Sequence, residues 1–587
     1  MLEIRTRKGE LLWGKGPAIG IAALATIIAG AALYYRSSLL PMIRLDEIQS
    51  AEYLFVLFAS MALIALYAGF AESWQLHRLF VFPGLIFPST ALLFAGVYKL
   101  GMHQFGGWDE DLLVHAATYY TQGLRPYLDF PCTMPPLFMA TIRWSVKLLG
   151  LRWSSFALIP ATFSALTSLW IFGLLRRVAV RPHWALVVTI CVEMCTMLME
   201  PFWWYNNASC IAVVLLFLSV LACLQRQSPM LSWISLCLSL AIVLASKPNV
   251  APACLMVAVL FLAEDKRQCK KTLLACAGAL VLAVLVCYAA QMPPDALLHS
   301  YAEAAKLRGS PLSMIPFKQL GWPKGVFQGI FVVVNALSFI ALLVISAKRR
   351  PGNWRVLSVC AIAALSALLM ACTNADLKNS DLSILLVAVC ILCLCPWEMK
   401  DASAGRKTVL ASWLCVFLVM AGFFSVIHLR VLLIGEGLYY EPVPTKTIQG
   451  GFFSGLEAGP RLQRVLHQTG EVLSILPSER VFFGPRLEFA YAAFGKPVTP
   501  GMPLVWDAGN LFSPARIPSL LLTIQKRDPD LLIFKKGDYT GMGLAAFYIT
   551  TSEAYQRINN FSELTVYVRK KEVPVTYIRI PAGTPTF

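Results

Sequence analysis

Long apolar runs separated by short polar turns fill the first 430 residues of the sequence. A helix that crosses a bilayer needs about 20 consecutive apolar residues, and most of these runs approach or reach that length. The pattern therefore predicts an α-helical polytopic membrane protein with about thirteen spanning helices. The predicted segments are 17–35, 51–71, 79–101, 155–175, 184–202, 208–225, 230–246, 249–263, 272–291, 327–347, 355–373, 381–396 and 409–429.

The basic residues between these segments predict the orientation of the chain. Dense Lys and Arg clusters occur at 176–181, 266–271, 348–350 and 400–407, and the predicted helix count places all four on one side. Cytoplasmic loops carry an excess of Lys and Arg, so this side is the cytoplasm. We expect the N-terminus to be cytoplasmic, with 17–35 as an uncleaved signal anchor; a cleaved signal peptide is the alternative.

The pattern changes after residue 435. Apolar runs become short, Gly and Pro appear, and charges alternate with apolar residues. Helical spacing over Arg461–Leu476 and strand-like runs at Arg480–Phe483, Leu531–Phe534 and Leu564–Arg569 predict a small α/β domain, with a further helix over Pro514–Gln525. We thus expect a transmembrane domain at 1–435, with an external loop at 102–153, and an extracytoplasmic α/β domain at 436–587.

Composition supports the membrane assignment and narrows the function. Of the 587 residues, 57% are hydrophobic and only 14% are charged, whereas soluble proteins carry about 25% charged residues. The net charge of +17 is accounted for by cytoplasmic loops, and no nucleic-acid-binding motif accompanies it. Most of the sixteen cysteines lie in apolar segments, where cysteine acts as a small apolar residue, so we expect no disulfide and no cysteine metal site.

The stretch 106–137, GGWDEDLLVHAATYYTQGLRPYLDFPCTMPPL, carries the candidate chemistry. Three consecutive acids, Asp109, Glu110 and Asp111, precede an apolar helical stripe, and Gly123 is placed to end that helix. The simplest interpretation is a solvated loop that stops a spanning helix. The ordered helix behind the acids favours a site, because negative charge at a helix N-terminus is stabilised by the helix dipole.

This stretch resembles the first external loop of the GT-C superfamily of membrane glycosyltransferases, which includes protein mannosyltransferases and aminoarabinose transferases. The resemblance rests on an ordered set of residues: Asp109-Glu110, a helix over 112–122, Gly123, Tyr127, Asp129 and Pro135-Pro136-Leu137. One departure is that two more spanning segments precede this loop than in the GT-C pattern, which leaves the side of the membrane unchanged.

The resemblance implies that a sugar moves from a polyprenyl-phosphate donor to a glycan, lipid or protein acceptor on the extracytoplasmic face, with inversion at the anomeric carbon. It implies a hexosyl- or pentosyltransferase of the cell envelope in the inner membrane. Asp109 is then the expected general base. Glu110 would orient it or bind the sugar, Asp129 would position the acceptor or sugar, and Tyr127 would contact the substrate.

Basic and amide side chains on the same predicted face are candidates for donor binding. Lys247 lies at a Pro-bounded break between two short apolar segments, which is where membrane proteins place polar sites. Lys306 and Arg308 lie in the basic external loop 292–326, and with Lys247 they are expected to bind the donor phosphate. Asn206 and Asn207 follow Trp203-Trp204-Tyr205 and are expected to bind substrate, unless they form a plain turn behind an interfacial aromatic belt.

Two other classes of protein share part of this pattern. A transporter or flippase for a lipid-linked sugar would also have many helices and external charges, but it predicts repeated halves, which the sequence does not show. A structural protein of the envelope would not need an acid cluster backed by an apolar helix. We expect no cofactor and no metal, since the D-x-D at Asp109–Asp111 occupies adjacent helix positions and is a poor chelate; a divalent cation is the alternative.

Overall fold

The computed structural model describes most of residues 81–308, then 354–374, 445–504, 526–536, 555–558 and 561–570, together with a few single positions such as Tyr439. Within the first range, 104, 108, 181, 198–200, 225–229, 249 and 251–265 are not described. The segments predicted at 17–35, 51–71 and 409–429 lie outside the described residues. So do nearly all of 249–263, 327–347 and 381–396, and nearly all of the helix predicted over Pro514–Gln525.

The chain divides into two compact units. One unit consists of Met1–Gly101, Ala157–Val286 and Ser310–Arg430, and the other of Met102–Phe156, Cys287–Gly309 and Val431–Phe587. The external loop and the C-terminal region therefore belong to the same unit, although more than 270 residues separate them in the sequence. The predicted domain boundary at 435/436 falls among residues that the structure does not describe and stays a prediction.

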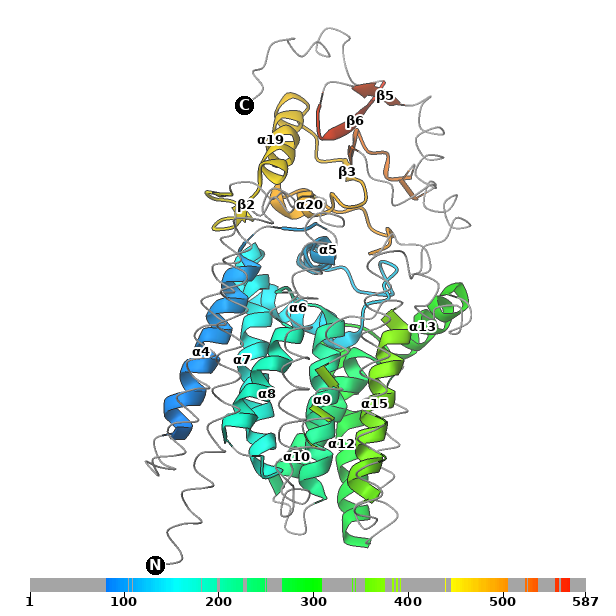
Figure 1. Ribbon diagram of the computed structural model, residues 1–587. Helices are drawn as coiled ribbons and strands as arrows, with labels where there is room; N and C mark the ends of the chain where they lie inside the picture. The colour runs from blue at the N-terminus through cyan, green and yellow to red at the C-terminus, as the bar shows by residue number, and fades with distance from the viewer. Residues whose placement is uncertain are drawn as a thin grey trace, which may run out of the picture. The chain divides into compact units, whose positions relative to one another are not determined.

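The first unit is a bundle of apolar helices (Figure 1). Among the described residues, three helices are long and apolar enough to cross a membrane: α7 (Trp153–Arg177), α9 (Tyr205–Cys223) and most of α12 (Lys266–Ala289). Apolar segments of other helices are shorter. These helices are α4 (Val81–Gly101), α8 (Pro182–Cys195), α10 (Met230–Ser246) and α15 (Trp354–Asn374).

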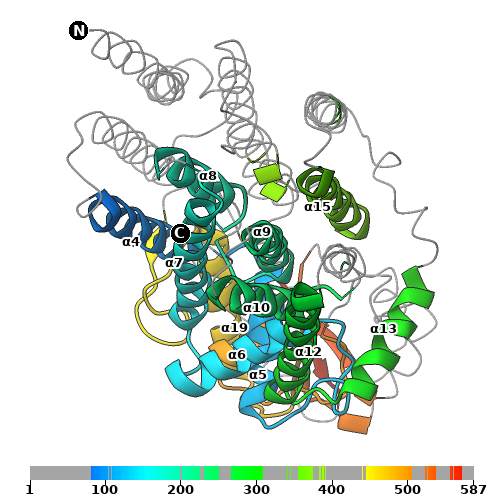
Figure 2. The same cartoon turned by 90° about the horizontal axis from the view of Figure 1, so that it is seen from below.

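Helix α9 is the centre of this bundle. Its residues from Asn206 to Cys223 are all buried, and it packs most extensively against α10 and then α15 (Figure 2). The bundle also contains buried polar groups: Glu193 of α8, fully buried, accepts hydrogen bonds from Ser164 Oγ at 2.6 Å and Thr167 Oγ1 at 2.9 Å on α7. Each buried carboxylate oxygen thus has a hydroxyl donor, as a group in an apolar bundle requires.

The second unit combines three helices of the external segments with the C-terminal sheet. The external helices are α5 (Asp109–Thr121), α6 (Pro136–Leu149) and α13 (Pro294–Arg308). The C-terminal part adds α19 (Pro460–Ile475) and the short α20 (Phe489–Ala493), which lies against α5 (Figure 1). A two-stranded ribbon pairs β1 (Lys446–Thr447) with β2 (Glu457–Ala458).

In the part of the chain that the structure describes, the sheet has four strands in the order β3-β4-β6-β5. Strand β3 (Val481–Phe483) runs parallel to β4 (Leu531–Lys535), while β6 (Leu564–Arg569) is antiparallel to both β4 and β5 (Tyr555–Ile558). All five residues of β4 are buried. A continuous apolar run suits a strand that is covered on both faces, which is why Leu531–Phe534 was readable from the sequence.

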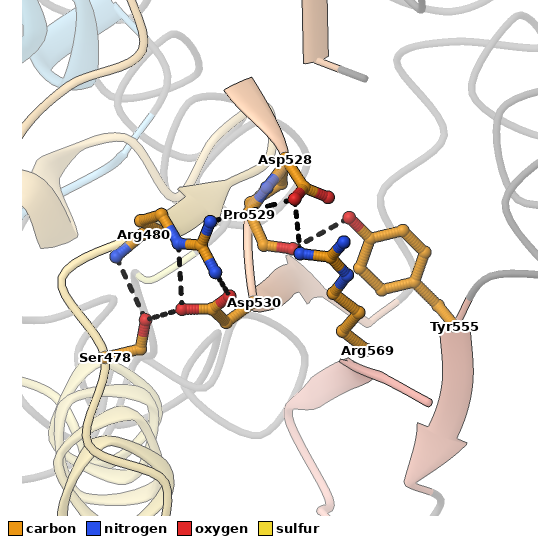
Figure 3. Close-up of polar contacts among 7 residues, drawn as sticks. All are labelled: Ser478, Arg480, Asp528, Pro529, Asp530, Tyr555 and Arg569. Atoms are coloured by element: carbon orange, nitrogen blue, oxygen red, sulfur yellow. Dashed lines mark hydrogen bonds and ion pairs between the residues drawn. The ribbon is translucent and has the colours of Figure 1, made fainter. Parts of the chain in front are cut away.

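A polar network connects the strands at one end of the sheet, where β4 begins (Figure 3). Asp528 and Asp530, just before β4, pair with Arg480 before β3, and Asp528 also pairs with Arg569 at the end of β6. Ser478 Oγ donates to Asp530 at 2.7 Å, and Tyr555 Oη of β5 donates to the Pro529 carbonyl at 2.7 Å. The side chains of this network therefore hold all four strands at the point where β4 begins.

Candidate functional site in the external loop

Helix α5 begins at the acids themselves. We expected the helix to start near Leu112, but its first residue is Asp109, so all three carboxylates lie in the first turn. The N–H groups of a first turn lack partners within the helix, and negative charge there is favourable. Asp109 and Glu110 are half-buried, while Asp111 is only 2% exposed.

The three acids have different surroundings. Glu110 turns back along the chain, and its Oε1 accepts a hydrogen bond from the Gly106 amide at 3.3 Å. Asp111 faces the C-terminal region, where its Oδ1 accepts from the Phe489 amide at 2.6 Å and its Oδ2 from the Glu488 amide at 3.3 Å. Consecutive helix residues point about 100° apart, so the oxygens of the three carboxylates diverge.

The face of α5 that carries Asp111 is a feature that the sequence analysis missed. We expected one apolar stripe, but residues 111–119 are all buried, so no face of this part of the helix is exposed. His115 stacks on Tyr119 at 4.4 Å and on Tyr491 at 6.1 Å between ring centroids. Burial lowers the pKa of His115 to about 3, so this ring is neutral. The spacing of Asp111, His115 and Tyr119 at every fourth residue was the available signal.

The loop after α5 is built from local turns. Gly123, with φ of +76°, ends the helix, and Tyr127 adopts φ of +65°. The Tyr127 hydroxyl donates to the Met134 carbonyl at 3.1 Å. Asp129 Oδ2 accepts from the Arg125 amide at 2.8 Å and from Arg125 Nε at 3.1 Å, and these bonds lower the pKa of Asp129 below its usual range. Asp129 is therefore an ionised acid paired with Arg125, and the Tyr127 hydroxyl bonds the two ends of the segment 127–134 to each other.

The segment 287–309 packs onto this loop through side-chain bonds to backbone carbonyls. Tyr120 Oη donates to Ala290 at 2.7 Å, Arg143 Nη1 donates to Ala289 at 2.7 Å, and Ser300 Oγ donates to Cys132 at 3.0 Å. These contacts place α13 beside the loop. Lys306 is exposed on α13, and Arg308 is the last residue of that helix.

In the helical bundle, the structure brings a residue predicted to bind the donor phosphate next to one predicted to bind substrate. Lys247 follows the end of α10 and is 5% exposed, and its Nζ donates to Asn206 Oδ1 at 2.8 Å. The alternative that Asn206 and Asn207 form a connecting turn is wrong, because both are buried at the start of helix α9. Trp203 and Trp204 are 2% and 5% exposed, so they pack inside the bundle instead of forming an interfacial belt.

Among the described residues, no three His, Cys, Asp or Glu side chains are grouped closely enough to hold a metal ion. The first turn of α5 illustrates the reason locally, because Glu110 and Asp111 direct their oxygens at different backbone amides.

No protein-family profile and no curated protein sequence matches this chain. Solved structures do resemble it. ArnT from Cupriavidus metallidurans bound to undecaprenyl phosphate has a TM-score of 0.50 and 12% identity, over 83% of this chain and 98% of that one. The apo form of the same protein has a TM-score of 0.49 and 12% identity, over 81% and 97%. An Archaeoglobus fulgidus oligosaccharyltransferase has 0.40 and 11%, over 80% and 70%.

The likeness to ArnT covers most of this chain and nearly all of that one. At 12% identity it establishes the fold, and that fold is the one expected from the acidic loop. The chain is therefore a membrane protein with the fold of the GT-C glycosyltransferases.

Proposed function

We propose that this protein is an integral membrane glycosyltransferase that moves a sugar from a polyprenyl-phosphate donor to an acceptor on the extracytoplasmic face. The observation that carries the proposal is the likeness to ArnT over 83% of this chain and 98% of that one, in a structure that contains undecaprenyl phosphate. The acidic first turn of α5 supports it, because a transferase needs a carboxylate placed to take a proton from the acceptor hydroxyl. The proposal places the enzyme in the inner membrane, with the external loop and C-terminal domain outside the cytoplasm.

Within the acidic first turn, Asp109 is the best candidate for the base. Asp111 is buried and its two oxygens bind the amides of Glu488 and Phe489, so it is turned toward the protein interior. Glu110 is bound to the Gly106 amide at 3.3 Å, which suits an orienting role. Asp109 is half-buried and is the leading acid of the pair on which the resemblance rests, so we assign it as the base. Asp129, held ionised by Arg125, is proposed to position acceptor or sugar.

The proposed reaction is a single displacement. Asp109 accepts the proton of the acceptor hydroxyl while the hydroxyl oxygen attacks the anomeric carbon of the sugar. The bond from that carbon to the phosphate oxygen breaks, and its electron pair stays on the phosphate. Polyprenyl phosphate leaves, and attack from the opposite face inverts the configuration. Negative charge grows on the leaving phosphate, so cationic groups that are fixed beforehand stabilise the transition state. We assign this role to Lys247, Lys306 and Arg308, with Asn206 orienting the Lys247 ammonium.

The test compares acid variants in membranes that contain the full-length protein, using a donor labelled in its sugar. Asp109→Asn should lower the rate of sugar transfer by about a hundredfold or more, while donor binding stays near that of the wild type. Glu110→Gln and Asp129→Asn should retain partial activity, because these residues orient other groups. Full transfer by Asp109→Asn would overturn its assignment as the base. Movement of the intact labelled donor across vesicles without transfer would support the transporter alternative instead.

A further inference from the structure

The C-terminal region contacts the external loop on both sides of Asp109 and Glu110. On the N-terminal side, the buried Phe105 ring lies 5.2 Å from Phe489, 5.2 Å from Phe453 and 5.9 Å from Tyr439, between centroids. The Tyr439 amide also donates to the Gly106 carbonyl at 3.3 Å. This aromatic cluster fixes the chain immediately before α5.

Asp111 makes the contact on the C-terminal side. Its carboxylate accepts the amides of Phe489 at 2.6 Å and Glu488 at 3.3 Å, so two consecutive backbone donors converge on one side chain. Phe489 therefore takes part in both contacts, through its ring with Phe105 and through its amide with Asp111. The residues thus held lie four positions before and two positions after Asp109.

A second carboxyl completes the contact. Glu488 is 4% exposed, and its side chain interacts with that of Asp111, so two buried acids lie next to each other. Burial raises the pKa of both groups, and the negative charge of Asp111 raises that of Glu488 further, while Arg486 opposes the shift in both. A buried pair of this kind is satisfied only when the two chain segments are in register.

The far end of α5 is held by the same region. Tyr119 Oη donates to the Met502 carbonyl at 3.1 Å, and the Val498 amide donates to Gln122 Oε1 at 3.0 Å. Beyond the helix, the Gly501 amide donates to the Asp129 carbonyl at 3.0 Å. Residues 488–504 thus follow α5 and its loop from the acidic turn to Asp129.

We propose that Asp111, through its contact with Glu488 and Phe489, is a positioning residue that sets the placement of the Asp109 carboxylate. The inference rests on the proposed function, since it assigns the C-terminal region a part in the transfer reaction. Asp111 lies two residues from Asp109, a rise of about 3 Å along the helix, so a shift of one carries the other. A misplacement of about 1 Å at a reacting group costs on the order of a hundredfold in rate.

The experiment uses the full-length protein, assayed with the labelled donor and with hydrogen–deuterium exchange. Asp111→Leu removes both acceptor oxygens, so kcat should fall about a hundredfold. Asp111→Asn keeps one acceptor oxygen, so kcat should fall about tenfold. In both variants the KM for donor should stay within about twofold of wild type. Exchange should quicken in peptides covering 109–121 and 484–495. Glu488→Gln retains a donor toward Asp111 and should keep more activity than Glu488→Ala.

The matched control is Glu479→Gln, which alters an exposed ion pair with Lys496 in the same region and should leave both readouts unchanged. Variants of Asp111 that transfer sugar at the wild-type rate would overturn the positioning role while leaving the proposed function intact. A rise in KM with kcat unchanged would also overturn it, because that pattern indicates lost donor binding. A wild-type protein without transfer activity would instead overturn the proposed function, and the positioning role with it.

Discussion

At the scale of single residues, the buried ammonium of Lys247 is the most informative cation in the described part of the bundle. A charge that is 5% exposed is expensive to bury without hydrogen bonds, and Asn206 supplies one at 2.8 Å. The amide oxygen orients the ammonium next to the first turn of α9. A lysine fixed in this way suits an anionic ligand such as a phosphate.

Lys247→Met keeps the length of the side chain and removes its charge. Hydrogen bonds to charged groups contribute about 1.5–3 kcal/mol, so the KM for a polyprenyl-phosphate donor should rise about tenfold or more. Steady-state kinetics in membranes measure this effect. Lys270→Met, at an exposed position in the cluster predicted to be cytoplasmic, is the control and should behave like wild type. An unchanged donor KM in Lys247→Met would remove this residue from the donor site.

His115 predicts a pH dependence of stability. Its pKa is lowered from 6.5 to about 3 by burial, so below pH 6.5 the unfolded chain gains a proton that the folded protein does not bind. The folded state should therefore lose about 1.4 kcal/mol per pH unit as the pH falls from 6.5 toward 3. Above pH 6.5 the ring is neutral in both states and contributes no slope.

His115→Phe keeps the stacked ring on Tyr119 and Tyr491, and Nδ1 of the histidine is buried without a hydrogen-bond partner among the described residues. The variant should thus lose less stability than wild type between pH 6.5 and 5, measured by thermal unfolding in detergent. An equal loss of stability between pH 6.5 and 5 in the two proteins would show that the His115 ring is protonated in the folded state.

At the scale of elements, the turn before α5 depends on glycine. Gly107 has φ of +78°, and a Cβ built there would lie 2.0 Å from Tyr439 Cδ2. Gly107→Ala should destabilise the unit by well over the roughly 1–2 kcal/mol that a left-handed conformation costs an L-residue, because the Tyr439 ring must also move. Gly123→Ala is the matched control, because Gly123 has a similar φ of +76° but a Cβ built there would meet no neighbouring atom within 4 Å. Equal losses in melting temperature would contradict the packing of Tyr439 over this turn.

The sequence predicted elements well where local patterns decide them. Helix α10 was predicted at its observed bounds, and β6 likewise, because an apolar run and an alternating run are local signals. Strand β5 was missed because Tyr555–Ile558 is a mostly polar strand at the sheet edge. The contact of Asp111 with Phe489 spans 378 positions, and no local periodicity indicates which distant amides a buried carboxylate will bind.

At the scale of the whole molecule, the external loop and the C-terminal region form one compact unit. The candidate base lies on a helix that is held at both ends by residues 488–504, which gives the C-terminal region a part in the chemistry under the proposed function. The likeness to ArnT, over 98% of that chain, shows the fold that the resemblance in the loop predicted.

The most direct measurement is sugar transfer by the purified wild-type protein in proteoliposomes that contain a polyprenyl-phosphate sugar labelled in the sugar, with extracted envelope lipids, glycans and proteins supplied as acceptors. We predict that the label leaves the polyprenyl phosphate and appears on one class of acceptor with inverted anomeric configuration. Label that crosses the bilayer while still attached to its lipid, with no acceptor labelled, would contradict the assignment as a transferase.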